Sequence, residues 1–148
     1  MEITHLITRG VILCDESVLL VRQKGMDYTF LPGGHIETGE SAAAALKREV
    51  EEELGLELRV EEFLGCVEAG WQEEGIDNYE VNLIFKAVID SLSADTPPSS
   101  REEHLEFLWS PVSALEQNSL MPVPLRELLE TYAAGERSVW WGSTLGGS

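Results

Sequence analysis

An α/β fold, in which helices cover a β-sheet, is what this sequence predicts. Short apolar runs typical of strands alternate along the chain with at least two segments of helical character, and no segment is repeated. The chain has 148 residues, of which 43% are hydrophobic and 25% charged, the size and balance of one globular domain. We therefore expect a single domain over residues 1–148.

The first elements predicted are two strands joined by a tight turn. Residues 6–13 and 18–21 are apolar, and the polar residues 15–17 interrupt them. A short extended piece follows at residues 28–31, and Pro-Gly-Gly at 32–34 predicts a sharp break in the chain. The two adjacent glycines also allow a ligand to approach the backbone closely.

The next element is a helix with clear signals at both ends. Ser41 can cap its first turn, residues 42–54 are mostly strong helix formers, and Gly55 is placed to end it. Of all the elements, this helix has the strongest local signals.

Strands resume after this helix. Residues 58–67 and 79–89 read as strands, and in the second run Val81, Leu83 and Phe85 share one side. Residues 71–78 between them are acidic and contain glycine, which predicts a loop. The sequence therefore predicts two strands separated by a loop.

The last third of the chain starts with a polar segment. Residues 91–101 hold two prolines and four serines, so we expect a mobile excursion or a lid. A strand at 107–109 and a helix at 124–134 follow, the helix with leucines and a tyrosine at helical spacing. The tail, 135–148, has no predicted structure, but Trp140 and Trp141 must fold back on the domain or pack on a second subunit, so a homodimer is possible.

Composition limits the partners and the compartment. The formal charge is −17, from 27 acidic and 10 basic residues, which disfavours nucleic acid. No apolar stretch approaches the roughly 18 residues of a membrane span, and no leader-like run begins the chain, so we expect a cytoplasmic protein with no membrane partner. Cys14 and Cys66 stand apart in apolar runs, as buried reduced thiols do.

Glutamates gather on one face of the helix predicted at 42–54. At 100° per residue, Glu49, Glu52 and Glu53 fall within a sector of about 100°. Their mutual repulsion destabilises the chain, and a hard divalent cation reverses the sign of this effect. Because Mg²⁺ and Mn²⁺ prefer oxygen ligands, either ion suits the cluster, and the hydrolysis of a phosphoanhydride is the natural chemistry.

The segment that holds these glutamates resembles the signature of a known family. Residues 34–56 read GHIETGESAAAALKREVEEELGL. This matches the box of the Nudix (MutT-like) hydrolases: Gly, five residues, Glu, seven residues, then Arg-Glu-apolar-any-Glu-Glu-any-Gly-apolar. The matching residues are Gly34, Glu40, Arg48, Glu49, Val50, Glu52, Glu53, Gly55 and Leu56.

The resemblance implies a fold, a metal site and roles for the box residues. It implies an α/β/α sandwich around a mixed β-sheet, with the box forming a loop, a helix and a loop. It also implies that the three glutamates bind Mg²⁺ or Mn²⁺, with the Gly33 carbonyl as a further ligand, and that Arg48 holds a box carboxylate in place. Gly34 and Glu40 are expected to contact the substrate.

Other site residues are less defined. Family members often use a carboxylate from outside the box as ligand or general base, and Glu103 is our candidate, with Glu102 and Glu106 as alternatives. Tyr28, Phe30 and Trp71 could stack on a nucleobase, but aromatic residues near strand ends more often pack in the core or at its rim. His35 could contact phosphate from within the box loop.

The function that follows is Mg²⁺-dependent hydrolysis of the diphosphate linkage in a nucleoside diphosphate joined to another moiety. Nucleoside triphosphates, nucleotide sugars and dinucleoside polyphosphates all remain open as substrates. The alternative is a Nudix-like nucleotide-binding regulatory module without turnover, although such modules commonly lose box glutamates and this chain has them all. An isomerase on the same fold is a third possibility, which no residue supports specifically.

Overall fold

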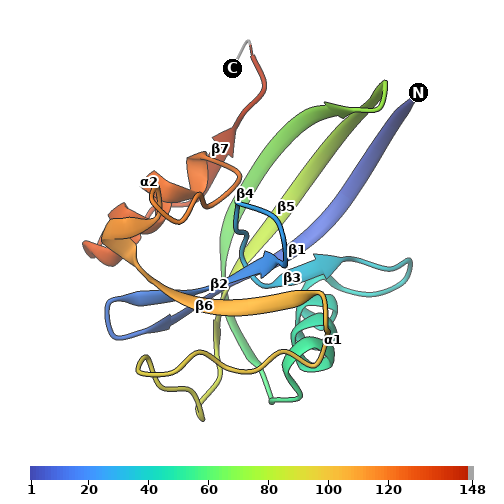
Figure 1. Cartoon of the computed structure of the whole chain (residues 1–148). Helices are drawn as coiled ribbons and strands as arrows, with labels where there is room; N and C mark the ends of the chain where they lie inside the picture. The colour runs from blue at the N-terminus through green and yellow to red at the C-terminus, as the bar shows by residue number, and fades with distance from the viewer. Residues whose placement is uncertain (147–148) are drawn as a thin grey trace.

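Strands and helices alternate in the structure, a computed structural model that describes residues 1–146 (Figure 1). The strands of the described chain are β1 (Glu2–Cys14), β2 (Ser17–Gln23), β3 (Gly33–His35), β4 (Arg59–Glu73), β5 (Ile76–Val88), β6 (Leu105–Pro111) and β7 (Trp140–Ser143). The helices are α1 (Ala42–Leu54), the short 3₁₀ helix η1 (Val112–Ala114) and α2 (Pro124–Ala133). The predicted α/β class is confirmed.

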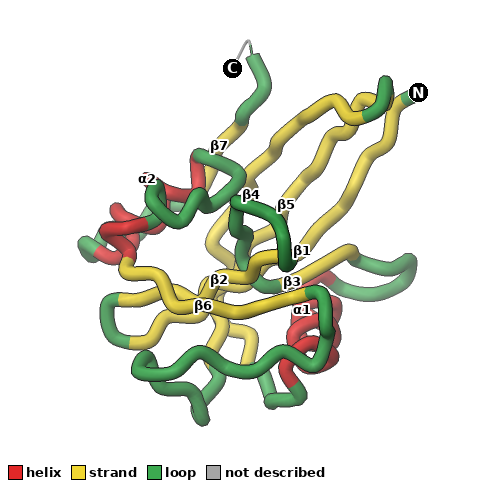
Figure 2. Tube along the Cα trace, viewed as in Figure 1, coloured by secondary structure: helices red, strands yellow, loops and turns green. Residues whose placement is uncertain are grey.

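The strands form one mixed sheet. Its order is β6-β2-β1-β5-β4-β7, and β3 pairs with β1 beside this path. β1 runs parallel to β5, and β4 runs parallel to β7, while the other pairs are antiparallel. Figure 2 shows the long strands β1, β4 and β5 extending together beyond the two helices.

The two helices cover opposite faces of this sheet. Successive side chains of a strand point to opposite faces, and in β1 Val11 joins the apolar cluster of α2 whereas Ile12 joins the cluster of α1. The sheet therefore lies between two apolar layers. This is the α/β/α sandwich that the family resemblance implied.

Helix α1 begins and ends as the sequence predicts. The Ser41 hydroxyl accepts a hydrogen bond from the Ala44 amide (3.1 Å), and Gly55 adopts a left-handed conformation (φ 68°) while donating to the Glu51 carbonyl. Its buried face includes Leu46, Val50 and Leu54, which pack on the sheet.

Helix α2 also confirms its prediction, and the tail packs against it. Leu125, Leu129 and Tyr132 are buried along one face of α2. The Trp140 ring packs edge-on against Tyr132 with 5.9 Å between ring centroids, while Trp141 points outward with 58% of its surface exposed. One of the two tryptophans therefore folds back on the domain, and β7 is an element that the sequence did not predict.

Two predicted breaks in the chain are wrong. Residues 71–78, predicted as a loop, mostly continue β4 and β5, and only Glu74 and Gly75 form the turn between them. These arms are exposed and lack an apolar run, but the start of β1 pairs with β5 from Asp77 onward and holds them in the sheet. Gly33 and Gly34 likewise belong to β3 rather than to a break.

The remaining connections agree with the predictions in part. The hairpin of β1 and β2 is confirmed, and Cys14 and Cys66 are free thiols, though half-buried rather than buried. The polar segment 91–101 runs below β6 (Figure 1) and is anchored at its middle and at its last residue: the Trp109 indole donates to the Thr96 carbonyl, and the Arg101 amide donates to the Glu53 carbonyl.

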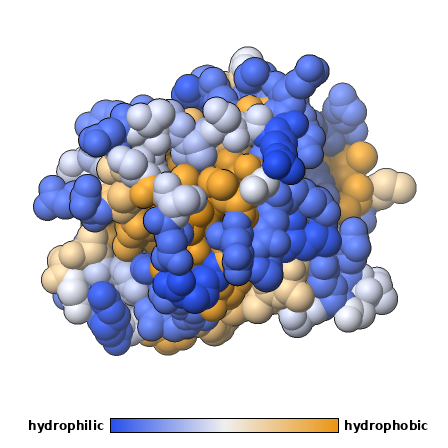
Figure 3. Space-filling view, turned by 90° about the horizontal axis from the view of Figure 1, so that it is seen from below, coloured by the Kyte–Doolittle hydropathy of each residue, from blue (hydrophilic) through white to orange (hydrophobic). Residues whose placement is uncertain are grey.

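The surface combines hydrophobic and hydrophilic areas. On the face seen from below, hydrophobic residues gather in the middle and hydrophilic residues surround them (Figure 3). Among residues 1–146 no helix has the length and the apolar character to cross a membrane.

Candidate active site

The site starts at the close approach of β3 to two neighbours. Gly33 has φ 147°, and a β-carbon there would overlap the Thr8 carbonyl of β1. A β-carbon on Gly34 would lie 2.5 Å from the carboxyl carbon of Glu49. Position 33 therefore requires glycine, whereas Gly34 leaves the flexible Glu49 side chain room to lie against the backbone.

Arg48 holds two carboxylates at the same time. Its Nε and Nη2 donate to the two oxygens of Glu40, at 2.7 and 2.9 Å, and its Nη1 donates to Glu49 at 3.0 Å. Glu40 also accepts a hydrogen bond from the Glu37 amide. The Arg48 hydrogen bonds, followed by that amide, lower the pKa of Glu40 to about 2, so Glu40 is a fixed anion that orients Arg48.

Glu53 has the least ordinary environment of the three box glutamates. Only 7% of its surface is exposed, and its Oε1 is buried without a hydrogen-bond partner. Burial, and after it the nearby Glu49 charge, raise the pKa of Glu53 to about 8, although the Arg9 charge acts in the opposite direction. A buried carboxylate oxygen without a partner is costly, and a cation would remove the cost.

Glu52 is the exposed member of the group. Its side chain is 57% exposed, and its carboxylate lies 3.6 Å from the Arg48 Nη1. In residues 1–146 no three His, Cys, Asp or Glu side chains are arranged to hold a metal ion together. The like charges of Glu49, Glu52 and Glu53 repel each other, and the carboxylates of Glu49 and Glu52 are directed toward Arg48. The three carboxylates therefore do not converge on one point.

The donor set nevertheless fits Mg²⁺ or Mn²⁺. All three glutamates lie on one rigid helix and offer only oxygen, which these hard cations prefer. The partnerless Glu53 oxygen supplies a ligand that no hydrogen bond within the described chain already occupies. Gly33, predicted to add a carbonyl, pairs with Arg9 in the adjoining strand.

A cleft of about 960 Å³ opens on the α2 side of the sheet, and the box glutamates are not among the residues that line it. Arg9 connects the two: it lines the cleft, donates to the Leu31 carbonyl at 3.0 Å, and interacts electrostatically with Glu53 and Glu80. The other side chains that could contact a ligand there are Tyr28, Phe30, Trp71, Asn82 and Arg126. The cleft therefore combines aromatic rings with a few polar groups, as small-molecule sites do.

Several residues of the cleft are not predicted by the sequence. Its aromatic residues are among the candidates for stacking on a base, but Arg9, Glu80, Asn82 and Arg126 are not among the predicted site residues. A signal existed for two of them, because Glu80 and Asn82 alternate with Val81 and so face the side opposite α1. No residue of the segment 91–101 lines the cleft, so the structure gives no support for a lid there.

The acidic residues outside the box occupy different surroundings. The Glu102 charge reaches Glu53 and raises its pKa, Glu106 pairs with Arg22 at 2.8 Å, and Glu103 is exposed. Of the three, Glu102 is therefore the one that the structure brings toward the box, while Glu103 stays a prediction.

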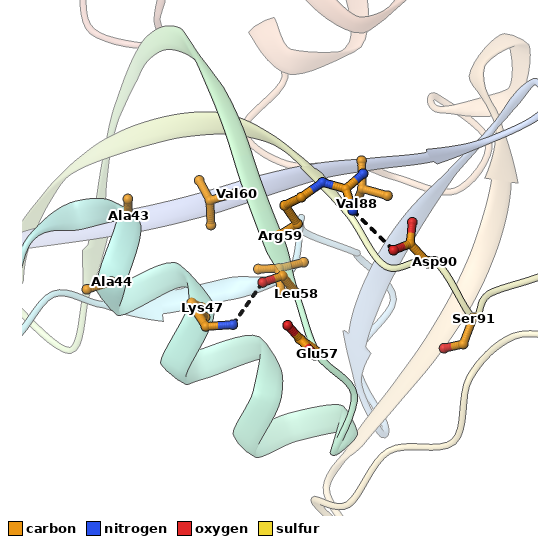
Figure 4. A pocket seen from close by; sticks show the side chains of 10 residues that line it. All are labelled: Ala43, Ala44, Lys47, Glu57, Leu58, Arg59, Val60, Val88, Asp90 and Ser91. Carbon is orange, nitrogen blue, oxygen red and sulfur yellow. Dashed lines mark hydrogen bonds and ion pairs between the residues drawn. The ribbon is translucent and has the colours of Figure 1, made fainter.

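A second hollow, of about 620 Å³, lies on the other side of α1 (Figure 4). Its two cations already have partners: Lys47 contacts Glu51 at 2.6 Å and the Leu58 carbonyl at 3.0 Å, and Arg59 contacts Asp90 at 3.1 Å. This hollow therefore offers fewer unpaired charged groups to a ligand than the cleft lined by Arg9 does.

Comparison with known proteins finds relatives that match most of this chain. The family model described as "NUDIX domain" matches residues 4–132. An ADP-ribose pyrophosphatase of Methanocaldococcus jannaschii is 27% identical over 101 residues, which are 66% of this chain and 57% of that protein. A human 8-oxo-dGDP phosphatase is 31% identical over 116 residues, 75% of this chain and 31% of that protein. The chain thus spans about half or less of the length of these relatives.

Solved structures agree on the fold. The MutT protein of Bacillus halodurans superposes with a TM-score of 0.69 at 22% identity, over 94% of this chain and 88% of that one. A hydrolase of the same family from Nitrosomonas europaea has a TM-score of 0.67 at 24% identity, over 92% of this chain and 93% of that one.

Proposed function

Since this chain belongs to the Nudix family, we propose that it is a pyrophosphohydrolase that uses Mg²⁺ or Mn²⁺ to cleave the diphosphate linkage of a nucleoside diphosphate joined to another moiety. The observation that carries the proposal is Glu53. It is a buried carboxylate with one partnerless oxygen, and it interacts electrostatically with Glu49 and with Arg9, which lines a cleft that also holds aromatic residues. A folded protein keeps such a costly group where a ligand uses it.

Glu49, Glu52 and Glu53 would hold the divalent ions, with the Gly33 carbonyl as a further oxygen. When bound, such ions neutralise phosphate oxygens and make a coordinated water a stronger nucleophile. Burial then favours the reaction, because charges interact more strongly where water is excluded. Glu103, with Glu102 as its better-placed competitor, remains our candidate for the carboxylate outside the box.

Arg48, Glu40 and Gly34 would position the other groups. Both Glu40 oxygens are engaged by Arg48, so we assign Glu40 to holding the arginine rather than to contacting the substrate. Gly34 leaves space for the Glu49 carboxyl group. Together these residues would fix the carboxylates before the substrate binds, which lowers the cost of reorganisation during the reaction.

The cleft would bind the nucleoside part of the substrate. Its volume, about 960 Å³, is at the upper end of what small-molecule sites have. The names of the two relatives described above, ADP-ribose pyrophosphatase and 8-oxo-dGDP phosphatase, both include a nucleoside diphosphate, which supports the same class here. Nucleoside triphosphates, nucleotide sugars and dinucleoside polyphosphates fit the proposal equally.

The test is product release from a panel of these substrates with Mg²⁺ or Mn²⁺. We expect metal-dependent turnover of at least one, which Glu52→Gln lowers by roughly 100-fold or more because a charged ligand is lost. Glu51→Gln is the matched control, since Glu51 lies on the same helix but bonds Lys47 and the Leu58 amide. Nucleotide binding without turnover across the panel would instead favour the binding module.

Arg48→Lys should lower kcat by about 10- to 100-fold while the protein stays folded. Lysine keeps the positive charge but cannot donate to Glu40 through two nitrogens and to Glu49 through a third. Steady-state kinetics with circular dichroism as a fold check would measure this. Unchanged kcat would show that the arginine network does not position the carboxylates.

Trp71→Ala should raise KM by about 10-fold with little change in kcat. Its indole is 41% exposed in the cleft, and loss of a base-stacking ring costs about 1–3 kcal/mol. Trp141→Ala is the matched control, because this ring is also exposed but lies on β7 outside the cleft lining. Equal effects of the two substitutions on KM would argue against base binding at Trp71.

A further inference from the structure

Two histidines from separate strands meet beside Trp71, which lines the cleft. His5 lies in β1, and His35 is the last residue of β3. Ile7 is the partner of His35 in the ladder, so His5 lies two residues farther along the same face. The Nδ1 atom of His5 and the Nε2 atom of His35 are 3.0 Å apart.

The His5 ring is held in one orientation and one tautomer. Its Nε2 lies 2.9 Å from the Asn78 side-chain oxygen, and the Asn78 nitrogen donates to the Ile76 carbonyl, which fixes the amide orientation. Since an amide oxygen only accepts, Nε2 carries the hydrogen, and in the neutral ring Nδ1 then presents its lone pair toward His35. The Trp71 indole stacks on the His5 ring, with 5.7 Å between the two ring centroids and 16° between the ring planes.

We propose that His5 and His35 bind one divalent ion of the class that prefers imidazole, namely Cu²⁺, Ni²⁺ or Zn²⁺. Two nitrogens that are each about 2.0–2.1 Å from one ion, at tetrahedral or right angles, are roughly 2.8–3.4 Å apart. The nitrogens of His5 and His35 already have this separation. The Asn78 oxygen supplies the outer contact that typically orients a ligating histidine.

For the neutral pair, ion binding changes the tautomer of His35 and releases no proton. Without the ion, His35 donates its Nε2 hydrogen to His5 Nδ1. With the ion, His35 carries its hydrogen on Nδ1 instead, and both facing nitrogens donate lone pairs to the ion, whose other positions take water. His35 is exposed, so its ring has room for the small rotation that turns the two lone pairs toward one point.

This site is distinct from the glutamates of α1 in ligand type. Imidazole nitrogens select borderline transition ions, whereas carboxylate oxygens suit Mg²⁺ and Mn²⁺. The ion would connect β1, through His5, to the start of the box loop, through His35. The same loop contacts the box helix, because the His35 carbonyl accepts a hydrogen bond from Arg48 at 3.3 Å. The proposal does not depend on hydrolysis, because binding alone tests it.

The experiment titrates Ni²⁺ or Cu²⁺ into the full chain, without a histidine tag and with excess Mg²⁺ to occupy the carboxylates. We expect one ion per chain, quenching of Trp71 fluorescence by the adjacent paramagnetic ion, and a higher melting temperature, because the two ligands meet only in the folded chain. Trp71→Phe should lose most of the quenching but keep the thermal shift.

His5→Gln and His35→Gln should each weaken Ni²⁺ binding by about 10-fold or more. His104→Gln is the matched control, since the chain has three histidines and His104 lies elsewhere on the surface. Melting without the ion checks that each variant folds. The proposal is overturned if wild type binds no ion under excess Mg²⁺, or if the affinity survives both substitutions and falls only in Glu52→Gln.

Discussion

Glu53→Gln should raise the melting temperature of the metal-free protein at pH 8.5 by at least about 4 °C while lowering kcat by roughly 10³-fold. The two effects have one origin. Glu53 is buried with a partnerless oxygen, so its charge destabilises the metal-free fold, yet the same charge is what a divalent ion would bind. A neutral amide of equal size removes this charge, and with it both the destabilisation and the ligand for the ion.

The stability effect has a defined pH window. The pKa of Glu53 is raised from 4.5 to about 8 by burial and by the Glu49 charge. Between these pH values the folded chain keeps a proton that the unfolded chain has released, so the metal-free protein loses stability as the pH rises from about 4.5 to 8. Gln cannot titrate, so the advantage of Glu53→Gln should vanish near pH 4.5 and be complete above pH 8.

Thermal melts from pH 4.5 to 9, with a chelator and then with Mg²⁺, would measure this. Mg²⁺ should raise the melting temperature of wild type at pH 8.5 and have a smaller effect on Glu53→Gln. Glu51→Gln serves again as the control on the same helix. A variant that is less stable than wild type at pH 8.5 without metal would contradict the assignment of Glu53 as a destabilising buried charge.

Gly33→Ala should destabilise the protein by roughly 3 kcal/mol or more, which is a large part of the stability of a small domain. Two costs combine at this residue. Its φ of 147° is one that residues with a side chain rarely adopt, and the new methyl group would overlap the Thr8 carbonyl in the adjacent strand. Backbone atoms cannot move aside as the end of a flexible side chain can.

Gly39→Ala separates the two costs. Gly39 also has a positive φ, 86°, and lies in the loop after β3, but no neighbouring atom lies within 4 Å of the place that the new methyl group would take. We therefore expect a loss of only about 1 kcal/mol. Urea unfolding of both variants measures the difference, and equal losses would show that the contact of β3 with Thr8 is not the main cause.

The helix that carries the glutamates was predictable because its signals are local. Ser41 and Gly55 act on their own backbone neighbours, and the glutamates follow the helical period, so position along the chain was enough. The extended conformation of residues 71–78, where β4 and β5 project, was not predictable. Their polar side chains give no apolar pattern, and pairing with β1 keeps this part of the sheet extended. β7 was missed because four residues give too short a pattern.

The cleft was less predictable than the box for a related reason. Arg9, Asn82 and Arg126 lie far apart in sequence, and the topology of the sheet and α2 brings them together. The burial of Glu53 also depends on the fold, because helical periodicity assigns it to a face but not to a depth. The ligand types were therefore visible in the sequence, whereas the environment that alters the pKa of Glu53 was not.

Strand β1 holds Thr8 against the start of α1 and the next residue, Arg9, in the cleft on the opposite face. Under the proposed function, one stiff strand thus sets the spacing between the phosphate end and the nucleoside end of the site. Such a strand acts as a molecular ruler. It would select substrates by the number of bonds between the base and the cleaved linkage, and inserting a single residue ahead of Thr8 would reverse which face each later side chain of β1 serves.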